Sequence, residues 1–105
     1  MKKIVIEDMT FKIENKEEEK NFIEGIQKMK KILKESYDIP AKFSLFKNVY
    51  KNKNIFKLHL VFESEEVYSE FIAKISQEDR EKFNDYLGKY EIKYSRLEKN
   101  DINNF

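Results

Sequence analysis

The residue types most often used in catalysis are scarce in this 105-residue sequence, which contains one histidine, His59, and no cysteine. The lack of cysteine excludes thiolate metal sites, cysteine nucleophiles and a disulfide framework. His59 lies in an alternating apolar segment, on the face opposite Leu58 and Leu60, and no carboxylate stands beside it in the sequence. A Ser-His-Asp arrangement would therefore need a carboxylate from another element. We interpret His59 as a histidine at the surface or edge of a sheet.

Carboxylates are plentiful, with 20 Asp and Glu residues, so paired acids could serve acid–base chemistry or bind Mg²⁺. The sequence has no D-x-D-x-D-G string of the kind found in calcium-binding loops, and no G-x-S-x-G nucleophile turn. Its two glycines, Gly25 and Gly88, are isolated and do not make a phosphate-binding loop. We therefore predict that the chain is not an enzyme and uses no cofactor or metal ion.

Lysines gather between residues 41 and 62, where five lysines and no acidic residue contribute a charge of +5, although the whole chain has a net charge of only +1. Aromatic residues lie among them, so this segment could bind single-stranded nucleic acid through phosphate contacts and base stacking. Alternatively, the lysines protect the exposed face and edges of a sheet against aggregation, which is the more common situation. The candidate nucleic-acid-binding residues are Lys42, Phe46, Lys47, Tyr50, Lys51, Lys53, Lys57 and His59.

Acidic residues gather directly afterwards, with eight acids against three basic residues between positions 63 and 88. Carboxylates spaced along helices could imitate a phosphate backbone and fill a basic groove of a partner protein. Alternatively, they form solvated helix faces, with several acids placed favourably at helix starts. The candidate protein-binding residues are Glu63, Glu65, Glu66, Glu70, Glu78, Asp79, Glu81 and Asp85.

These features favour a non-enzymatic protein-interaction module. The composition is rich in Lys, Ile, Asn and Phe and poor in Arg, Ala and Gly, which is typical of AT-rich bacterial or phage genomes. We predict a phage or mobile-element accessory protein that binds a larger protein partner and inhibits a host nucleic-acid-processing machine, as anti-CRISPR and other anti-defence proteins do. One alternative is a single-stranded RNA- or DNA-binding module that uses the Lys42–Lys57 hairpin. Another is a homodimeric or larger structural assembly that pairs sheet edges through Tyr90–Tyr94.

No apolar run approaches the roughly 18–20 residues of a membrane span, and the N-terminus lacks the apolar stretch of a signal peptide. We therefore expect a cytoplasmic protein that does not interact with membranes.

The apolar pattern of Lys2–Ile13 predicts extended structure with a change of phase. The isoleucines up to Ile6 alternate in one phase, and the apolar residues from Met9 onward alternate in the other. The change falls at Glu7-Asp8, so this dipeptide is either a tight turn in a short hairpin or a bulge in one long strand. We favour the hairpin.

The remaining elements follow from periodicity and capping residues. Asn15 and an apolar stripe predict a helix over residues 16–37, in which Gly25 indicates close approach to the sheet. Alternation predicts strands at 42–45, 55–62 and 90–94, with a two-residue turn at 52–53 or a longer loop over 48–54. Ser64 and Ser76 predict a second helix that breaks, restarts and stops at Gly88.

The resulting order, ββαββααβ, fits an α+β fold with an antiparallel sheet and helices on one face, the ferredoxin-like split β-α-β arrangement. We expect one domain over residues 1–97 and a flexible polar tail over 98–105.

Overall fold

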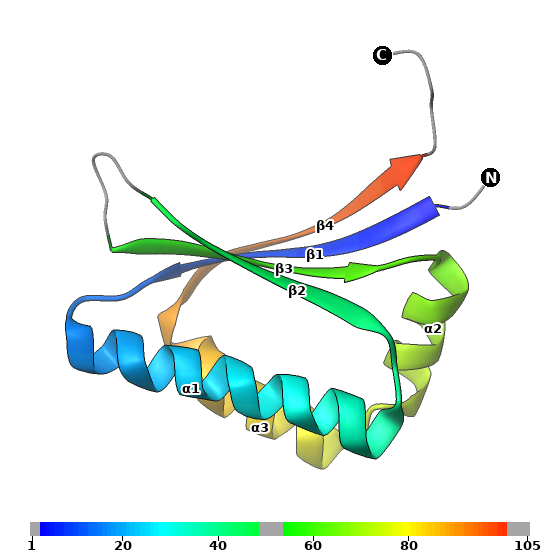
Figure 1. Cartoon of the computed structure of the whole chain (residues 1–105), viewed down its shortest axis with the longest axis horizontal. Coiled ribbons are helices and arrows are strands. Elements are labelled where there is room, and N and C mark those ends of the chain that lie inside the picture. The colour runs from blue at the N-terminus through cyan, green and yellow to red at the C-terminus, as the bar shows by residue number, and fades with distance from the viewer. Residues whose placement is uncertain (1–2, 49–53, 101–105) are drawn as a thin grey trace.

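The computed structural model describes residues 3–48 and 54–100, and within them four strands form one antiparallel sheet with three helices on one face (Figure 1). The sheet order is β2-β3-β1-β4, which confirms the predicted α+β class. The strands are β1 (Lys3–Lys12), β2 (Ala41–Lys47), β3 (Ile55–Phe62) and β4 (Glu91–Asn100). The helices are α1 (Lys16–Ile32), α2 (Glu65–Lys74) and α3 (Gln77–Leu87), with a π-helical turn η1 (Leu33–Tyr37) after α1 and a 3-10 turn η2 (Gly88–Tyr90) after α3.

The predicted N-terminal hairpin is wrong, because residues 3–12 form the single strand β1. Its pairing with β3 runs without interruption from Val5 opposite Phe62 to Lys12 opposite Ile55, so Glu7-Asp8 is neither a turn nor a bulge. The apolar phase changes because both faces of β1 carry apolar residues. Ile6 lies on the face away from the helices, whereas Phe11 lies against them and is fully buried.

A bulge does occur in the sheet, at the other neighbour of β1. Thr10 pairs with Lys93 in β4, but the next residue, Phe11, pairs with Glu91, so Ile92 is the extra residue. A bulge of this kind shifts the following side chains of its strand to the opposite face. Glu91 therefore lies on the same face of the sheet as Phe11, toward the helices.

The helix starts confirm the predicted caps. The side-chain oxygen of Asn15 accepts a hydrogen bond from Glu18 N at 2.9 Å. Ser64 Oγ accepts from Val67 N at 3.2 Å, and Ser76 Oγ accepts from Asp79 N. Each cap satisfies a backbone N–H group that has no partner within its own helix.

Gly25 marks a close approach between two helices and not, as predicted, between a helix and the sheet. A Cβ atom at this position would lie 2.9 Å from Tyr86 Cβ of α3. α1 and α3 run side by side beneath the sheet, and α2 lies at one end of it (Figure 1). The small residue lets the two long helices pack closely enough to cover the same sheet face.

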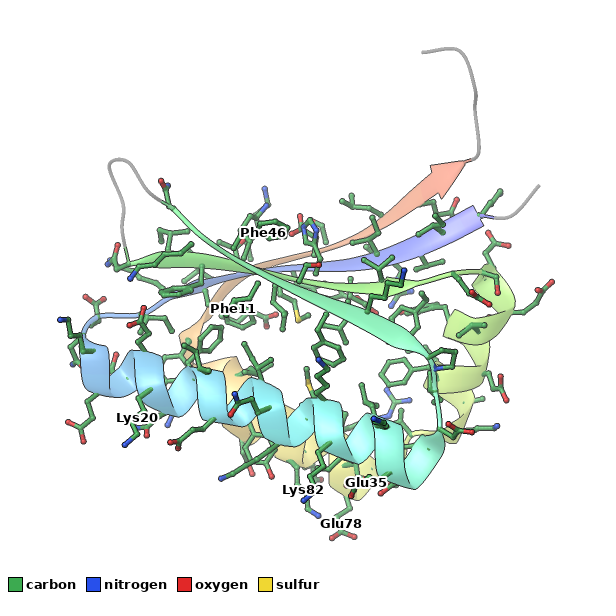
Figure 2. All side chains as sticks on the ribbon, viewed as in Figure 1. Phe11, Lys20, Glu35, Phe46, Glu78 and Lys82 are labelled. Carbon is green, nitrogen blue, oxygen red and sulfur yellow. The ribbon has the colours of Figure 1, made fainter. Side chains whose placement is uncertain are left out.

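Aromatic rings fill the layer between the sheet and the helices. The Phe11 and Phe22 rings lie 4.8 Å apart, and the Phe62 ring lies 5.1 Å from that of Phe71. Figure 2 shows Phe11 on the helix side of the sheet and Phe46 on the opposite side. Within the described residues no helix covers that opposite side, which we call the open face.

The C-terminal strand is longer than the sequence pattern indicated. β4 continues to Asn100, and Val5 pairs with Glu98, so strand pairing extends into the segment predicted as a tail. Residues 101–105 and the predicted turn at 52–53 lie outside the described residues. Among the helices that the structure describes, none is both long and apolar enough to cross a membrane.

Candidate functional site

A buried carboxylate lies on the helix-facing side of the sheet. Glu7 occupies the central strand β1 opposite Leu60 of β3 and is only 7% exposed. Its neighbours in the same phase, Val5 and Met9, are apolar. Because an ionised carboxylate loses several kcal/mol of hydration when it is buried, it must be compensated by hydrogen bonds and charge.

Two phenols supply those hydrogen bonds. Tyr68 of α2 donates to Glu7 Oε1 at 2.5 Å, and Tyr94 of β4 donates to Glu7 Oε2. Burial and the hydrogen bond to Glu7 raise the pKa of both hydroxyls. Both tyrosines therefore remain protonated at neutral pH and act as donors to the carboxylate.

A cation completes the cluster from the solvent side. Arg96 Nε lies 3.9 Å from Glu7 Oε1, and its guanidinium group lies 4.8 Å from the centre of the Tyr68 ring. Arg96 Nη2 also donates to the Tyr94 hydroxyl at 3.4 Å. The arginine side chain is 54% exposed. Arg96 therefore offsets part of the charge of Glu7 while its own side chain stays in contact with solvent.

A cavity of about 250 Å³ opens beside this cluster, between the sheet and α3. Glu7 and Tyr94 form part of its wall, and Glu91 forms another part. Burial and the nearby charge of Glu7 raise the pKa of Glu91. The rest of the lining is mostly apolar and comprises Met9, Met29, Leu60, Phe71, Phe83, Asn84, Leu87 and Gly88.

An apolar hollow with a few converging polar groups is the usual form of a small-molecule site. A carboxylate that is held in place by two donors can accept a proton from a bound molecule. Within residues 3–48 and 54–100, no three His, Asp or Glu side chains lie close enough together to hold a metal ion.

The predicted basic residues are divided between the two faces of the sheet. The described members Lys42, Phe46, Lys57 and His59 lie on the open face. Lys47 lies on the helix side, where its ammonium group is 2.9 Å from Glu19 Oε1. The others, Tyr50, Lys51 and Lys53, lie outside the described residues. Nucleic-acid binding by this set stays a prediction.

His59 has the carboxylate partner that its sequence surroundings lacked. Asp8 of β1 lies directly opposite it, with Asp8 Oδ1 3.0 Å from His59 Nε2 and Asp8 Oδ2 3.3 Å from Lys57 Nζ. The ring of Phe46 lies 5.3 Å from the imidazole. His59 is thus in a central strand on the open face and is separated by the sheet from the cavity.

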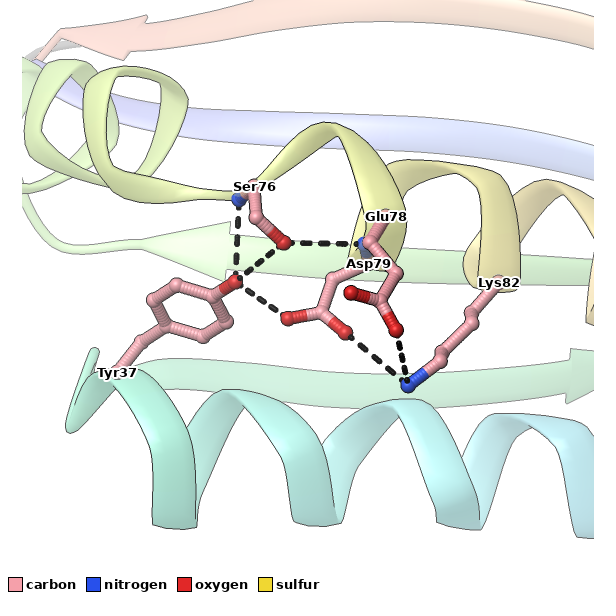
Figure 3. A network of polar contacts seen from close by, with 5 residues as sticks. All are labelled: Tyr37, Ser76, Glu78, Asp79 and Lys82. Carbon is pink, nitrogen blue, oxygen red and sulfur yellow. Dashed lines mark hydrogen bonds and ion pairs between the residues drawn. The ribbon is translucent and has the colours of Figure 1, made fainter.

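The predicted acidic residues are spread over α2 and α3, and several contact nearby cations or cap helices. Glu65 Oε1 lies 3.7 Å from Lys3 Nζ, and Glu78 Oε1 lies 3.6 Å from Lys82 Nζ. Glu70 forms an ion pair with Lys74. Asp79 contacts Lys82 and accepts a hydrogen bond from Tyr37 (Figure 3). None of the eight predicted acids lines the cavity described above. Protein binding by this set stays a prediction.

The cavity cluster was not predicted from the sequence, because the phase change at Glu7-Asp8 was interpreted as a break in the strand. A continuous strand would have placed Glu7 in phase with Val5 and Met9, as a charge at a core position. Tyr90 and Tyr94, which were considered as residues that pair sheet edges between copies, both have partners within the chain. Tyr90 is buried in the core and Tyr94 binds Glu7.

No protein-family model matches the sequence, and no curated protein matches it. Several solved structures share its fold. A candidate antibiotic biosynthesis monooxygenase from Bordetella bronchiseptica has a TM-score of 0.64 at 10% identity, over 94% of this chain and 97% of that one. A candidate monooxygenase from Lactobacillus acidophilus has a TM-score of 0.61 at 12% identity, over 90% of this chain and 43% of that one. A dimeric protein of unknown function with a ferredoxin-like fold, from Bacteroides fragilis, has a TM-score of 0.58 at 15% identity, over 91% of this chain and 94% of that one.

At these identities the likeness shows the fold alone. The prediction that the chain is not an enzyme is contradicted by this comparison, because two of the structures with the same fold are candidate monooxygenases. That prediction rested on the absence of familiar motifs, whereas the cavity cluster is formed by residues of three elements that no local motif connects.

Proposed function

We propose that the chain is a small enzyme of the monooxygenase kind, whose active site is the cavity beside Glu7. The observation that carries the proposal is a buried carboxylate on the wall of an apolar cavity, held by two protonated phenols. A charged group at a core position costs stability, so its presence favours a functional role over packing. The names of the similar structures add monooxygenation as the class of reaction.

Glu7 and Tyr94 would act together as the proton acceptor. Tyr94 lines the cavity and already donates its hydroxyl hydrogen to Glu7, so its oxygen can accept a proton from a bound hydroxyl group. Because the pKa of Tyr94 is raised, a free tyrosinate is unfavourable. The proton from the substrate would therefore reach Tyr94 as the hydrogen of Tyr94 passes to Glu7. The deprotonated phenol is electron-rich and would react with dioxygen, of which one atom enters the ring as the second quinone oxygen and the other leaves as water.

Tyr68 would be a positioning residue. It does not line the cavity, and it holds the second oxygen of Glu7 from α2. Arg96 lies on the solvent side and limits the cost of keeping Glu7 charged. General acid–base groups that are held in this way typically contribute about 10²–10⁴-fold to a rate.

The test combines binding and turnover. Phenol, 4-methylphenol and 2-naphthol are titrated into ¹⁵N-labelled protein, and dioxygen consumption is followed with the same compounds. We expect shifts at cavity residues such as Leu60 and Leu87, and dioxygen consumption that falls about 100-fold or more in Glu7→Gln. Glu35→Gln, at an exposed acid of η1 that does not line the cavity (labelled in Figure 2), serves as the matched control. Failure of every compound to shift the cavity residues would contradict the proposed site, and a rate unchanged in Glu7→Gln would contradict the role of the carboxylate.

We also propose that two copies of the chain associate through the open face. The row of cross-strand neighbours Val61, Ile6 and Leu97 is apolar, and Leu97 is 44% exposed. Phe46 on the same face is 51% exposed. Exposed apolar groups on one face usually mark an interface, and the similar structure from Bacteroides fragilis is of a dimeric protein.

A further inference from the structure

The charges around the cavity are of one sign. Two carboxylates, Glu7 and Glu91, form part of its wall, and among the described residues that line it there is no lysine, arginine or histidine. A phosphate or carboxylate ligand would be repelled by this wall and would find no cation to receive it. The wall therefore selects against anionic molecules.

The two carboxylates differ in how they are compensated. Glu7 has two phenol donors and the nearby guanidinium group of Arg96, which does not line the cavity. The Glu91 side chain has no hydrogen bond or ion pair within the part of the chain that the structure describes, and the residue is partly open to solvent. Of the two carboxylates in the cavity wall, Glu91 is therefore the one without a cationic partner among the described residues.

The surroundings of Glu91 suit a cation with an apolar body. Glu91 follows η2 directly, and Asn84 and Gly88 from the same stretch also line the cavity. A Cβ atom on Gly88 would lie 2.3 Å from Asn84 Oδ1, so the glycine leaves room for that amide. An ammonium group could donate to both Glu91 and the Asn84 oxygen. Phe71, Phe83 and the two methionines offer the apolar contacts.

We infer that the natural ligand of the cavity is a small phenol with an amine arm, whose hydroxyl group meets Tyr94, whose ammonium group binds Glu91 and whose ring lies among the aromatic and thioether side chains. The cavity of about 250 Å³ is smaller than the sites of drug-sized ligands, so one ring with a short arm fits it best. This inference rests on the proposed function, because it assigns the substrate class of the same site.

Three probes of equal shape and different charge test the inference. They are 2-phenylethylamine, 2-phenylethanol and phenylacetate, titrated into the protein at low salt and followed by NMR shifts of the cavity residues. We expect the amine to bind at least about tenfold more tightly than the alcohol, and phenylacetate to bind most weakly. Glu91→Gln removes the preference for the amine and leaves the affinity for the alcohol unchanged. Glu98→Gln, the same change on the same strand but away from the cavity lining, keeps the preference.

Each other outcome has a distinct meaning. If the alcohol or phenylacetate binds as tightly as the amine, or if Glu91→Gln keeps the preference, the inference is overturned while the cavity remains a ligand site. If none of the three probes shifts a cavity residue and the phenols above also fail to do so, the proposed function itself is overturned.

Discussion

At the scale of single residues, the stability of the chain depends on how Glu7 is compensated. Its two oxygens are held by hydroxyls from a helix, α2, and from the neighbouring strand, β4. Hydrogen bonds to a charged group contribute more than those between neutral groups. Removal of one donor is therefore expected to lower the free energy of unfolding, because the buried charge would lose part of its compensation.

Tyr68→Phe is expected to lower the free energy of unfolding by about 1–3 kcal/mol, because it removes a donor to a buried carboxylate and keeps the ring. The ring contact between Tyr68 and Phe62, at 5.1 Å, survives the change. Urea denaturation measures the effect. Tyr86→Phe, a half-buried tyrosine outside the cluster, is the matched control. Equal stability of the two variants would show that Glu7 does not depend on this donor.

Glu7→Gln is expected to lower the pKa of Glu91, because it removes a neighbouring negative charge that raises it. Burial remains the larger cause, so the pKa of Glu91 should stay above its ordinary value. A carboxyl ¹³C titration of Glu91 gives the shift. Glu81→Gln, on the exposed face of α3, should leave that titration unchanged. An unaltered Glu91 pKa in Glu7→Gln would mean that the two carboxylates do not interact.

At the scale of elements, two contacts fix the helix layer that covers the cavity. Gly25 of α1 meets Tyr86 of α3, and Tyr37 at the end of η1 binds the start of α3. In the second contact, the Tyr37 hydroxyl donates to Asp79 and accepts from Ser76 N at 3.0 Å (Figure 3). Both contacts set the position of α3, which supplies one wall of the cavity.

Gly25→Ala is expected to destabilise the fold by about 1–3 kcal/mol, because the new methyl group would overlap Tyr86 Cβ, which cannot rotate away. The change removes a helix-interior glycine and so would otherwise gain about 1 kcal/mol in helix propensity. Chemical denaturation decides between the two effects. Gln27→Ala, exposed on the same helix, should change stability only slightly. If the Gly25→Ala variant were more stable than the wild type, α1 and α3 would be able to move apart without losing stability.

Tyr37→Phe is expected to raise the pKa of Asp79 toward its ordinary value, because the hydrogen bond from Tyr37 is the main cause of its lowered pKa. A carboxyl whose pKa is lower in the folded state stabilises that state above the ordinary aspartate range, and this stability disappears as the pH falls through the lowered value. The wild type should therefore lose more stability than Tyr37→Phe between neutral pH and about pH 2. Unfolding curves at both pH values measure this difference. An identical loss in both proteins would contradict the link.

The elements and their order could be predicted from the sequence, because caps at Asn15, Ser64 and Ser76 and the periodicity of β3 are local signals. The continuity of β1 could not be predicted from the sequence. Apolar residues occur on both of its faces, and only the tertiary structure shows which face the helices cover. The candidate site was missed for the same reason. Glu7, Tyr68 and Tyr94 come together only through strand order and helix placement, and no local spacing encodes that arrangement.

At the scale of the whole molecule, the sheet separates two environments. The helix side contains the cavity and its carboxylates, and the open face contains the Asp8–His59–Lys57 group beside an apolar row. A partner on the open face would not obstruct the cavity. The predicted inhibition of a host nucleic-acid machine stays a prediction, since no contact in the structure bears on it.

Leu97→Lys is expected to convert a dimer into a monomer, because it places a charge in the apolar row of the open face. Sedimentation velocity over a range of concentrations measures the association. Ile72→Lys, an exposed apolar residue of α2 on the other side of the molecule, should leave the association unchanged. A wild-type protein that remains monomeric at all concentrations would rule out the proposed dimer.

The bulge in β4 determines which insertions and deletions homologous sequences could tolerate in this strand. In a regular strand, Glu91 and Tyr94, three positions apart, would point to opposite faces, and the extra residue Ile92 is what brings both to the cavity. Ile92 is 59% exposed and has little packing to lose. A relative one residue shorter at this point would restore regular pairing and keep both groups on the same wall. Length differences at position 92 are therefore expected to be neutral for the chemistry, whereas a loss of one residue between β1 positions 7 and 11 would not be.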